Sequence, residues 1–210
     1  MSGTQRLLVA SHNPGKAREL RRLVARLRIE VVDLGGAGIR DVFEETGASY
    51  EENARGKAEH YARLARLPTL ADDSGLEVEA LGGLPGIHSA RHGGSGLDDA
   101  GRCRLILESL AGLPDPKRSA RFVAVAALAP APEGAGDTHL FRATCEGRIA
   151  TEPRGPHGFG YDPIFFYPPF GLTFGEIDEA RKDSVSHRGL ALAKVVDFLQ
   201  SAEGLNFLTI

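Results

Sequence analysis

The sequence predicts one α/β domain. Its 210 residues are 42% apolar, which is enough to build a compact core. Apolar segments typical of buried strands alternate with segments whose apolar residues recur at helical spacing. No internal repeat, low-complexity tract or obvious linker interrupts this pattern. We therefore expect residues 1–210 to form a single domain in which any two lobes share one sheet.

The first half of the chain supplies two expected helices and most of the short strands. Strands are expected at residues 6–11, 29–34, 67–73 and 76–81, the last two on either side of an acidic turn. The first helix is expected at residues 16–27, with one apolar face formed by Leu20, Leu23, Val24 and Leu27. The second is expected at residues 50–67, where Ser49 and Glu52 form a capping-box start.

The second half begins with a helix and continues with longer strands. Helices are expected at residues 98–110 and about 187–200, and strands at 118–130 and 139–151. The PAPEGAGD turn separates these two strands, so they are candidates for pairing with each other. A glycine-flanked aromatic segment follows at 158–168, and Ser186 is the candidate N-cap of the last helix.

The charges and the cysteines exclude several classes of protein. Twenty-five basic and 28 acidic residues give a formal charge of -3, so we expect no nucleic-acid partner and no polybasic membrane contact. Cys103 and Cys145 lie far apart, and no histidine cluster has metal-ligand spacing, so neither a disulfide framework nor a zinc site is expected. Because the chain has no signal peptide and no apolar run of membrane-spanning length, we expect a cytoplasmic location.

The segment SHNPGK, residues 11–16, is a candidate anion site. Asn13 is a good N-cap and Pro14 suits the first helical position, so the free N–H groups of the first turn would point back past the strand end. Gly15 permits close approach of a ligand to the backbone, and Lys16 adds a positive charge. The alternative is an ordinary strand-to-helix turn with a solvated lysine, because such turns are common. Neither a P-loop nor a Rossmann glycine pattern is present.

Two acidic segments are candidate metal sites. FEETG contains Glu44 and Glu45, and ADDSG contains Asp72 and Asp73 directly after an apolar run. Carboxylates of this kind are the hard oxygen ligands that Mg²⁺ prefers, together with substrate phosphates. For the glutamates a solvated loop is the alternative. For the aspartates, at the expected end of a buried strand, a cation or a reaction is the better explanation because burial of charge is costly.

Two later segments suit the recognition of a flat ring. In GFGYDP, Phe159 lies between glycines and could stack on a base, and Ser186 to Arg188 in KDSVSHRG would present donors at a helix start. The alternatives are an aromatic core strand and a plain capped helix.

In their order along the chain, these segments carry a resemblance. SHNPGK, EETG with ENARGKA, ADDSGLEVEALGGLPGIHSAR, GFGYDPIFF and KDSVSHRGLAL resemble the non-canonical purine nucleoside triphosphate pyrophosphatases, the family that acts on inosine and xanthosine triphosphates. The resemblance extends from about Leu7 to Leu199. It implies an elongated mixed β-sheet whose flanking helices form two lobes around a central cleft, and a homodimer. It also implies Mg²⁺-dependent hydrolysis of inosine, deoxyinosine and xanthosine triphosphates to monophosphate and pyrophosphate.

The resemblance assigns roles to individual residues. Asp73 matches the catalytic base and magnesium contact, and Glu45 a second metal-associated acid. The division of roles between Asp72 and Asp73, and between Glu44 and Glu45, stays open. The implied substrate-binding residues are Ser11, His12, Asn13, Pro14, Gly15, Lys16, Lys57, Ser74, Phe159, Gly160, Tyr161, Asp162, Lys182, His187 and Arg188.

The charges support these roles independently of the resemblance. A nucleoside triphosphate carries close to four negative charges, so a chain of charge -3 must compensate them locally with lysines and magnesium. Two other classes of protein remain possible from the sequence. One is a non-catalytic nucleotide sensor. The other is a different hydrolase, either a phosphomonoesterase with Asp72 as nucleophile or a septum-associated nucleotide pyrophosphatase of similar architecture.

Overall fold

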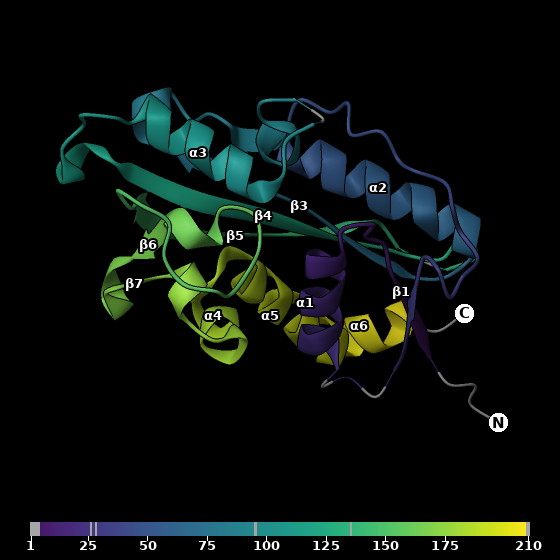
Figure 1. Ribbon diagram of the computed structural model, residues 1–210. Coiled ribbons are helices and arrows are strands. Elements are labelled where there is room, and N and C mark those ends of the chain that lie inside the picture. The colour runs from purple at the N-terminus through teal and green to yellow at the C-terminus, as the bar shows by residue number, and fades with distance from the viewer. Residues whose placement is uncertain (1–4, 26, 28, 95, 135, 209–210) are drawn as a thin grey trace. The chain divides into compact units, whose positions relative to one another are not determined.

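A computed structural model describes residues 5–25, 27, 29–94, 96–134 and 136–208, and it has the predicted α/β fold (Figure 1). The strands are β1 (Arg6–Val9), β2 (Glu30–Asp33), β3 (Thr69–Val78), β4 (Ser119–Ala129), β5 (His139–Ile149), β6 (Phe165–Tyr167) and β7 (Leu172–Thr173). The helices are α1 (Pro14–Val24), α2 (Tyr50–Ala65), α3 (Asp99–Ser109), α4 (Glu179–Val185), α5 (His187–Gln200) and α6 (Ala202–Phe207).

The described strands form one mixed sheet in the order β2-β1-β3-β4-β5-β6-β7. β1 runs parallel to both β2 and β3, whereas β6 runs antiparallel to β5 and β7. The order places β4 beside β5, which confirms that the two long strands are neighbours.

Contacts along the chain define two compact units. Unit 1 consists of residues 1–73, 124–143 and 188–210, and unit 2 consists of residues 74–123 and 144–187. β3, β4 and β5 each contribute residues to both units.

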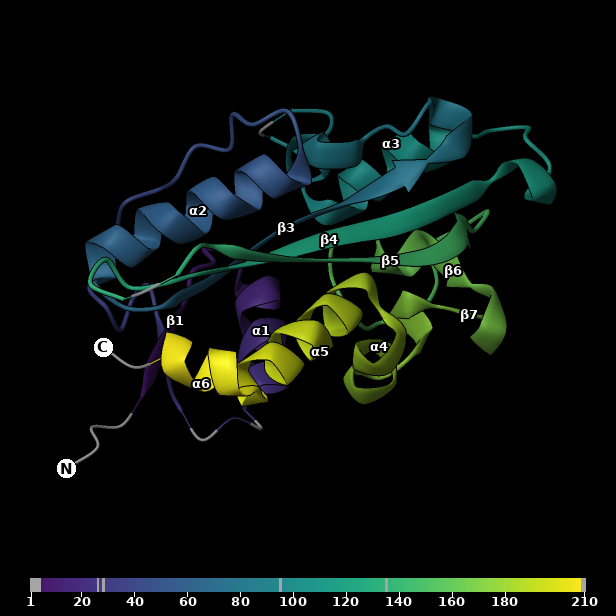
Figure 2. The ribbon, with the colours of Figure 1, turned by 180° about the vertical axis from the view of Figure 1, so that it is seen from behind.

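Unit 1 has helices on both faces of its strands. α2 lies on one face, and α1, α5 and α6 lie on the other, as the two opposite views agree (Figures 1 and 2). The core on the α1 side joins three elements through buried side chains such as Leu20 of α1, Val9 of β1 and Leu192 of α5. This packing holds the start of α1 and the start of α5 close to β3.

Unit 2 has a separate aromatic core. Phe122, Phe165 and Phe174 pack together, with ring centroids 4.4 to 6.0 Å apart. Arg118 is buried beside this core, and its guanidinium donates to the backbone oxygens of Leu110, Ile149 and Ala150. A buried guanidinium with every donor group directed at carbonyls is satisfied, so Arg118 holds the end of β5 in place.

Two predicted helix starts are confirmed. The Asn13 side chain accepts hydrogen bonds from the backbone N–H groups of Gly15 and Lys16, and Pro14 is the first helical residue of α1. Ser49 caps α2 by accepting from Glu52 N, but the Glu52 carboxylate reaches Ala48 N. The capping box therefore closes one residue earlier than the sequence predicts.

Other predictions need correction. The two short strands expected around an acidic turn are one continuous strand, β3, with Asp72 and Asp73 in its middle. Ser74 and Gly75 make no turn. α1 ends at Val24, earlier than expected, and residue 26 lies outside the described residues. The aromatic segment at 158–168 contains a 3₁₀ turn, Asp162–Ile164, before the short strand β6. α4 and α6 were not expected.

No helix in the described part of the chain is long and apolar enough to cross a membrane.

Candidate active site

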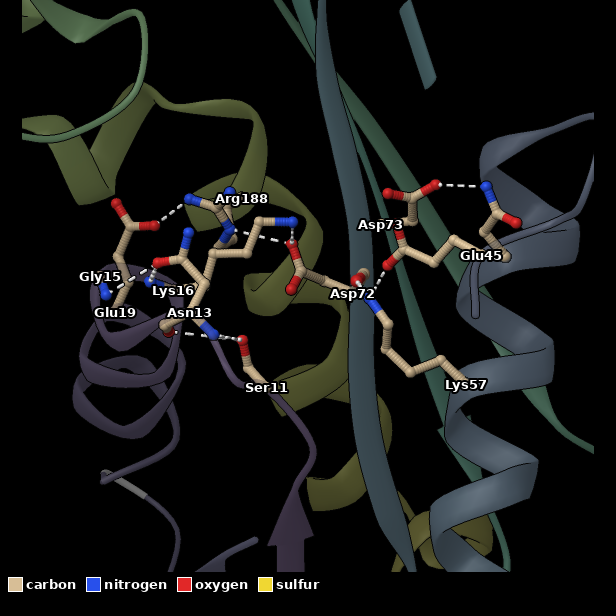
Figure 3. Close-up of polar contacts among 11 residues, drawn as sticks. Ser11, Asn13, Gly15, Lys16, Glu19, Glu45, Lys57, Asp72, Asp73 and Arg188 are labelled. Atoms are coloured by element: carbon tan, nitrogen blue, oxygen red, sulfur yellow. Dashed lines mark hydrogen bonds and ion pairs between the residues drawn. The ribbon is translucent and has the colours of Figure 1, made fainter. Parts of the chain in front are cut away.

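The central feature of unit 1 is the pair of aspartates in β3. The parallel neighbour β1 pairs with β3 only as far as Leu70, so Asp72 and Asp73 lie two and three residues beyond the last paired position. Successive side chains of a strand point to opposite faces. Asp72 points toward α1 and α5, and Asp73 points toward α2 (Figure 3). The aspartates are therefore buried on opposite sides of one strand.

Three cations surround Asp72. Arg188 Nε donates to Asp72 Oδ2 at 3.1 Å, and Lys16 Nζ lies 3.3 Å from the same oxygen. Lys57 Nζ donates to the backbone oxygen of Asp72 at 3.0 Å. Burial alone would raise the pKa of Asp72, but the charges of these cations outweigh it and hold the pKa well below its usual range. Asp72 is therefore charged at neutral pH.

Arg188 has a second carboxylate partner, Glu19 of α1. Its Nη1 atom pairs with Glu19 Oε2, and all three side chains of the Glu19–Arg188–Asp72 chain are 5% exposed or less (Figure 3). Burial alone would lower the pKa of Arg188, but the two carboxylates raise it above its usual value. The guanidinium therefore fixes Asp72 from one side.

Asp73 has a different environment. Asn53 Nδ2 donates to Asp73 Oδ2 at 3.0 Å. Burial raises the pKa of Asp73 above its usual value, and the Glu45 carboxylate adds to this effect, although the charges of Lys16 and Lys57 oppose it. A carboxylate with a raised pKa is a better proton acceptor, so Asp73 has the electrostatic character of a general base.

Lys57 links the two acidic segments. It lies on α2, and its Nζ pairs with Glu45 Oε1 as well as donating to Asp72 O. Burial would lower the pKa of Lys57, but the carboxylates of Glu45 and Asp72 raise it above its usual value. Its positive charge therefore stays in place between the EETG and ADDSG segments.

The start of α1 differs from the expectation in one respect. The N–H groups of Gly15 and Lys16, which were expected to be free, both donate to Asn13 Oδ1, and Ala17 N donates to Asn13 O. Ser11 Oγ accepts from Asn13 N at 3.3 Å (Figure 3). The expected backbone anion site is thus already capped. What this segment directs toward β3 is the ammonium group of Lys16.

His12 contacts the segment that leads to Glu45. Its Nε2 atom lies 2.9 Å from the backbone oxygen of Asp41 and 3.1 Å from Tyr61 Oη.

Unit 2 brings together the predicted residues of GFGYDP and Lys182. Asp162 Oδ2 accepts from Phe159 N at 2.8 Å and from Lys182 Nζ at 2.7 Å. The Lys182 ammonium also lies 4.8 Å from the centroid of the Phe159 ring, at cation–π distance. Lys182 and Asp162 are buried, whereas Phe159 is half-buried. In this geometry Asp162 and Lys182 hold the turn that presents the Phe159 ring.

The neighbours of Phe159 are also fixed inside unit 2. Tyr161 is buried and donates to Ser89 O, and Gly160 N donates to Asp99 Oδ2 at the start of α3. Cys103 Sγ lies 3.3 Å from Gly160 O, and burial raises the pKa of this thiol to about 12, so it remains a donor.

The structure separates the contacts of His187 and Arg188. The His187 ring stacks on Phe122 in unit 2, with centroids 4.5 Å apart, while Arg188 binds the carboxylates of unit 1. The prediction that they act as one pair therefore gains no geometric support from these contacts. Ser74 follows Asp73 in β3 and is half-buried.

Sequence reasoning missed Glu19 and Asn53. Asn53 lies one turn before Lys57 on α2, so its spacing from a predicted site residue was a usable signal. Glu19 lies three residues after Lys16 and beside the apolar stripe of α1, where an acid is costly to bury without a partner.

Glu45 and Asp73 are the residues on the α2 side of β3 that could hold a divalent cation. Glu45 and Asp73 are close enough for the charge of one to raise the pKa of the other, and a cation would relieve this repulsion. The described residues contain no group of three or more metal-ligating His, Cys, Asp or Glu side chains. Two carboxylates would leave the remaining coordination positions of a divalent cation to water or to other oxygen ligands.

Comparison with known proteins finds relatives that match most of this chain. The dITP/XTP pyrophosphatase of Syntrophobacter fumaroxidans is 49% identical over 90% of this chain and 79% of its own. That of Yersinia pestis is 43% identical over 94% of this chain and 100% of its own. A solved HAM1 protein from Coxiella burnetii matches with a TM-score of 0.84 and 40% identity, covering 95% of this chain and 100% of that one.

The family comparison covers nearly the whole chain. The model of the Ham1 family matches residues 7–198, a span that contains every residue of the site described above. The chain belongs to the Ham1 family.

Proposed function

We propose that this protein hydrolyses the non-canonical purine nucleoside triphosphates ITP, dITP and XTP to the nucleoside monophosphate and pyrophosphate, and so removes them from the nucleotide pool. Membership of the Ham1 family and the dITP/XTP pyrophosphatases among its relatives support this activity. The observation that carries the proposal is the pair of neighbouring aspartates in β3, one with a lowered and one with a raised pKa. Such divergence separates an electrostatic role from a proton-accepting role.

The cations of unit 1 are the proposed phosphate ligands. The side chains of Lys16 and Lys57 are each 15% exposed, so both lysines are largely removed from bulk water. Positive charge in such surroundings attracts phosphate oxygens more strongly than it would in bulk water. We assign Ser11 to Lys16 to the same role, with Lys16 as the charged member.

Glu45 and Asp73 would hold Mg²⁺ together with the phosphates of the substrate. Bound there, the ion would supply positive charge to the phosphate oxygens and assist ionisation of a nearby water. The family assignment supports a metal requirement, and the oxygen ligands favour Mg²⁺.

Asp73 is the proposed general base. It would accept a proton from a water molecule as the water oxygen bonds to the α-phosphorus and the bond from that phosphorus to the bridging oxygen of pyrophosphate breaks. Asn53 orients the carboxylate by donating to Oδ2. Asp72, fixed by Arg188 and Lys16, would hold Lys16 in place for the phosphates.

Phe159 is the proposed base-stacking residue. The turn formed by Gly160, Tyr161 and Asp162, with Lys182, fixes the position of its ring. Ser74, His187 and Arg188 remain proposed substrate residues from the sequence resemblance. Donors from His187 and Arg188 would favour the oxygen that inosine and xanthosine carry at position 6, where adenosine carries an amino group.

A panel of purified triphosphates with Mg²⁺, read for both products, tests the proposal. We expect ITP, dITP and XTP to yield equal amounts of monophosphate and pyrophosphate, far faster than ATP does. Release of orthophosphate would indicate a phosphomonoesterase, and tight binding without turnover would indicate a nucleotide sensor.

We also propose that the protein is a cytoplasmic homodimer without nucleic-acid or membrane partners. The formal charge of -3 supports the absence of a nucleic-acid partner, and the family resemblance supports the dimer. Light scattering at several protein concentrations would test the dimer.

A further inference from the structure

Three side chains of α2 contact the segment that carries Glu45. Asn53, Lys57 and Tyr61 are four residues apart, so they lie along one face of the helix. Asn53 Oδ1 accepts from Gly47 N at 2.8 Å, and Lys57 pairs with Glu45. We call residues 41–47 the strap; these residues form no helix or strand.

Tyr61 makes the third set of contacts. Its hydroxyl accepts from Phe43 N at 3.1 Å and donates to Asp41 O at 3.0 Å. The Tyr61 side chain is almost completely buried, with 1% of its surface exposed. A buried hydroxyl that both donates and accepts fixes the backbone on both sides of residue 42.

The spacing of the two segments matches. Four residues of helix advance by about 6 Å. Two residues of an extended chain span at most about 7 Å. Strap positions 47, 45 and 43 can therefore be met in turn by positions 53, 57 and 61 of α2. Alternate strap residues, at positions 43, 45 and 47, are therefore held by side chains of α2, and Glu45 is the middle one.

The helix surface is shaped for the strap at a further point. A Cβ atom at Gly56 would lie 2.8 Å from Phe43 Cζ, so glycine allows the Phe43 ring to lie against α2. The ring of His60 lies 5.5 Å from that of Phe43, between centroids. The strap is thus fastened by packing as well as by hydrogen bonds.

The Tyr61 hydroxyl also connects the strap to the segment Ser11–Lys16. His12 Nε2 lies 3.1 Å from Tyr61 Oη and 2.9 Å from Asp41 O. One buried hydroxyl therefore contacts both the segment proposed to bind phosphate and the strap proposed to carry a metal ligand.

We propose that Tyr61 is a positioning residue for Glu45. It acts by holding the strap backbone two and four residues before the carboxylate. This inference rests on the proposed metal role of Glu45. Loss of the hydroxyl would let the strap move, so the metal would bind more weakly, whereas turnover at saturating metal would be largely retained because Asp73 keeps its own partner, Asn53.

The test uses Tyr61→Phe, which removes the hydroxyl and keeps the ring. We expect the half-saturating Mg²⁺ concentration to rise about five- to tenfold, the size expected for loss of one or two buried hydrogen bonds, with kcat at saturating Mg²⁺ within about twofold of the parent. Mn²⁺ binding without nucleotide, followed by electron paramagnetic resonance, should weaken by a similar factor. Amide hydrogen exchange should accelerate in residues 41–47.

Tyr50→Phe is the matched control, because Tyr50 is a buried tyrosine on the same helix and its ring faces Arg142. It should leave the metal affinity and the exchange of the strap unchanged. Glu45→Gln is the reference for the metal role. If Glu45→Gln leaves Mg²⁺ dependence unchanged, the metal assignment fails and this inference fails with it. If Glu45→Gln weakens Mg²⁺ binding but Tyr61→Phe behaves like Tyr50→Phe, the inference alone is overturned.

Gly56→Ala provides a second variant that should fold well, since alanine favours a helix interior. It should displace Phe43 and accelerate exchange of the strap, with weaker Mn²⁺ binding. Normal Mn²⁺ binding in Gly56→Ala together with a displaced strap would contradict the proposed link between strap position and metal affinity.

Discussion

The two faces of β3 treat neighbouring aspartates in opposite ways. On the α1 side, Asp72 is held by Lys16 and Arg188, and its pKa is lowered. On the α2 side, Asp73 accepts a hydrogen bond from the neutral amide of Asn53, and its pKa is raised by burial and by the nearby carboxylate of Glu45. Two residues of the same type, adjacent in one motif, therefore have opposite electrostatic surroundings. The α1 side favours the charged form of Asp72, and the α2 side favours the protonated form of Asp73.

The same comparison is the electrostatic argument for the cation proposed on the α2 side. The α1 side holds two cations, Lys16 and Arg188, and the carboxylates of Glu19 and Asp72. The α2 side holds one cation, Lys57, and the carboxylates of Glu45 and Asp73. Lys16 and Arg188 compensate the α1 side, because both contact the carboxylate of Asp72. A triphosphate brought to Asp73 would add negative charge where the imbalance already lies, and a divalent ion would offset it.

The largest expected effect is that of Asp73→Asn on turnover. The amide is a poor base, so kcat for ITP should fall by about 10²–10⁴-fold, the usual contribution of general acid–base catalysis. Stability should be unchanged or slightly increased, because burial disfavours the charge that the substitution removes. Steady-state kinetics and a thermal melt on the same preparation measure both effects. A folded Asp73→Asn protein with near-normal kcat would show that Asp73 is not the general base.

The next largest effect is on stability, and it comes from a substitution on the α1 side of β3. Asp72→Asn leaves Arg188 with one buried carboxylate fewer, so at neutral pH the unfolding free energy should fall by about 3–5 kcal/mol. Because the native pKa of Asp72 is below its unfolded value of about 3.9, the stabilisation is present above that value and is lost as the pH falls below it.

Urea unfolding of the parent and Asp72→Asn proteins at several pH values measures this difference. The gap between their unfolding free energies should be widest above about pH 5 and should narrow below about pH 4. A gap that stays constant over this range would show that Asp72 contributes packing, not charge.

The third effect separates Lys16, which is partly exposed, from Lys182, which is buried. Lys16→Ala should weaken binding of ITP by about tenfold or more and leave binding of inosine almost unchanged, because its partner is the phosphate charge. Lys182→Ala should weaken the binding of both ITP and inosine and lower the stability of the protein. It leaves Asp162 buried without its ammonium partner and frees the turn that carries Phe159. Calorimetric titration with ITP and inosine distinguishes them. A selective loss of ITP binding in Lys182→Ala would instead support the role in phosphate binding that the sequence predicts for that lysine.

Local signals in the sequence were sufficient for most of the fold. Asn13 and Pro14 define the start of α1, Ser49 that of α2, and the apolar spacing of 187–200 matches α5. These features depend on residues within a few positions of one another. β3 was misjudged because two acids after an apolar run are typical of a strand end. The strand continues since Lys16 and Arg188, both distant in sequence, compensate Asp72.

The candidate site was predictable as a set of motifs but not as a set of contacts. The sequence identified Asp72, Asp73, Glu45 and the lysines, and left open which aspartate does what. The two aspartates differ in the residues that contact them, and those residues depend on which side of β3 each side chain faces. Glu19 could not be recognised as the partner of Arg188, because the two are 169 positions apart and meet only through packing of α1 against α5.

The smallest expected effect comes from the residue that carries no charge. Phe159→Ala removes a half-buried ring but keeps the backbone N–H that donates to Asp162, so the turn should persist. Stacking on an aromatic ring contributes about 1–3 kcal/mol per base and depends on the face of the base, not on its edge. We therefore expect kcat/KM to fall by about tenfold for ITP, GTP and ATP alike, with the ratio of ITP to ATP unchanged. Phe159→Tyr keeps a ring and should retain most of the activity. If the ITP to ATP ratio collapses in Phe159→Ala while Phe159→Tyr is normal, selectivity depends on how this ring orients the base, and unit 2 contributes more than a stacking surface.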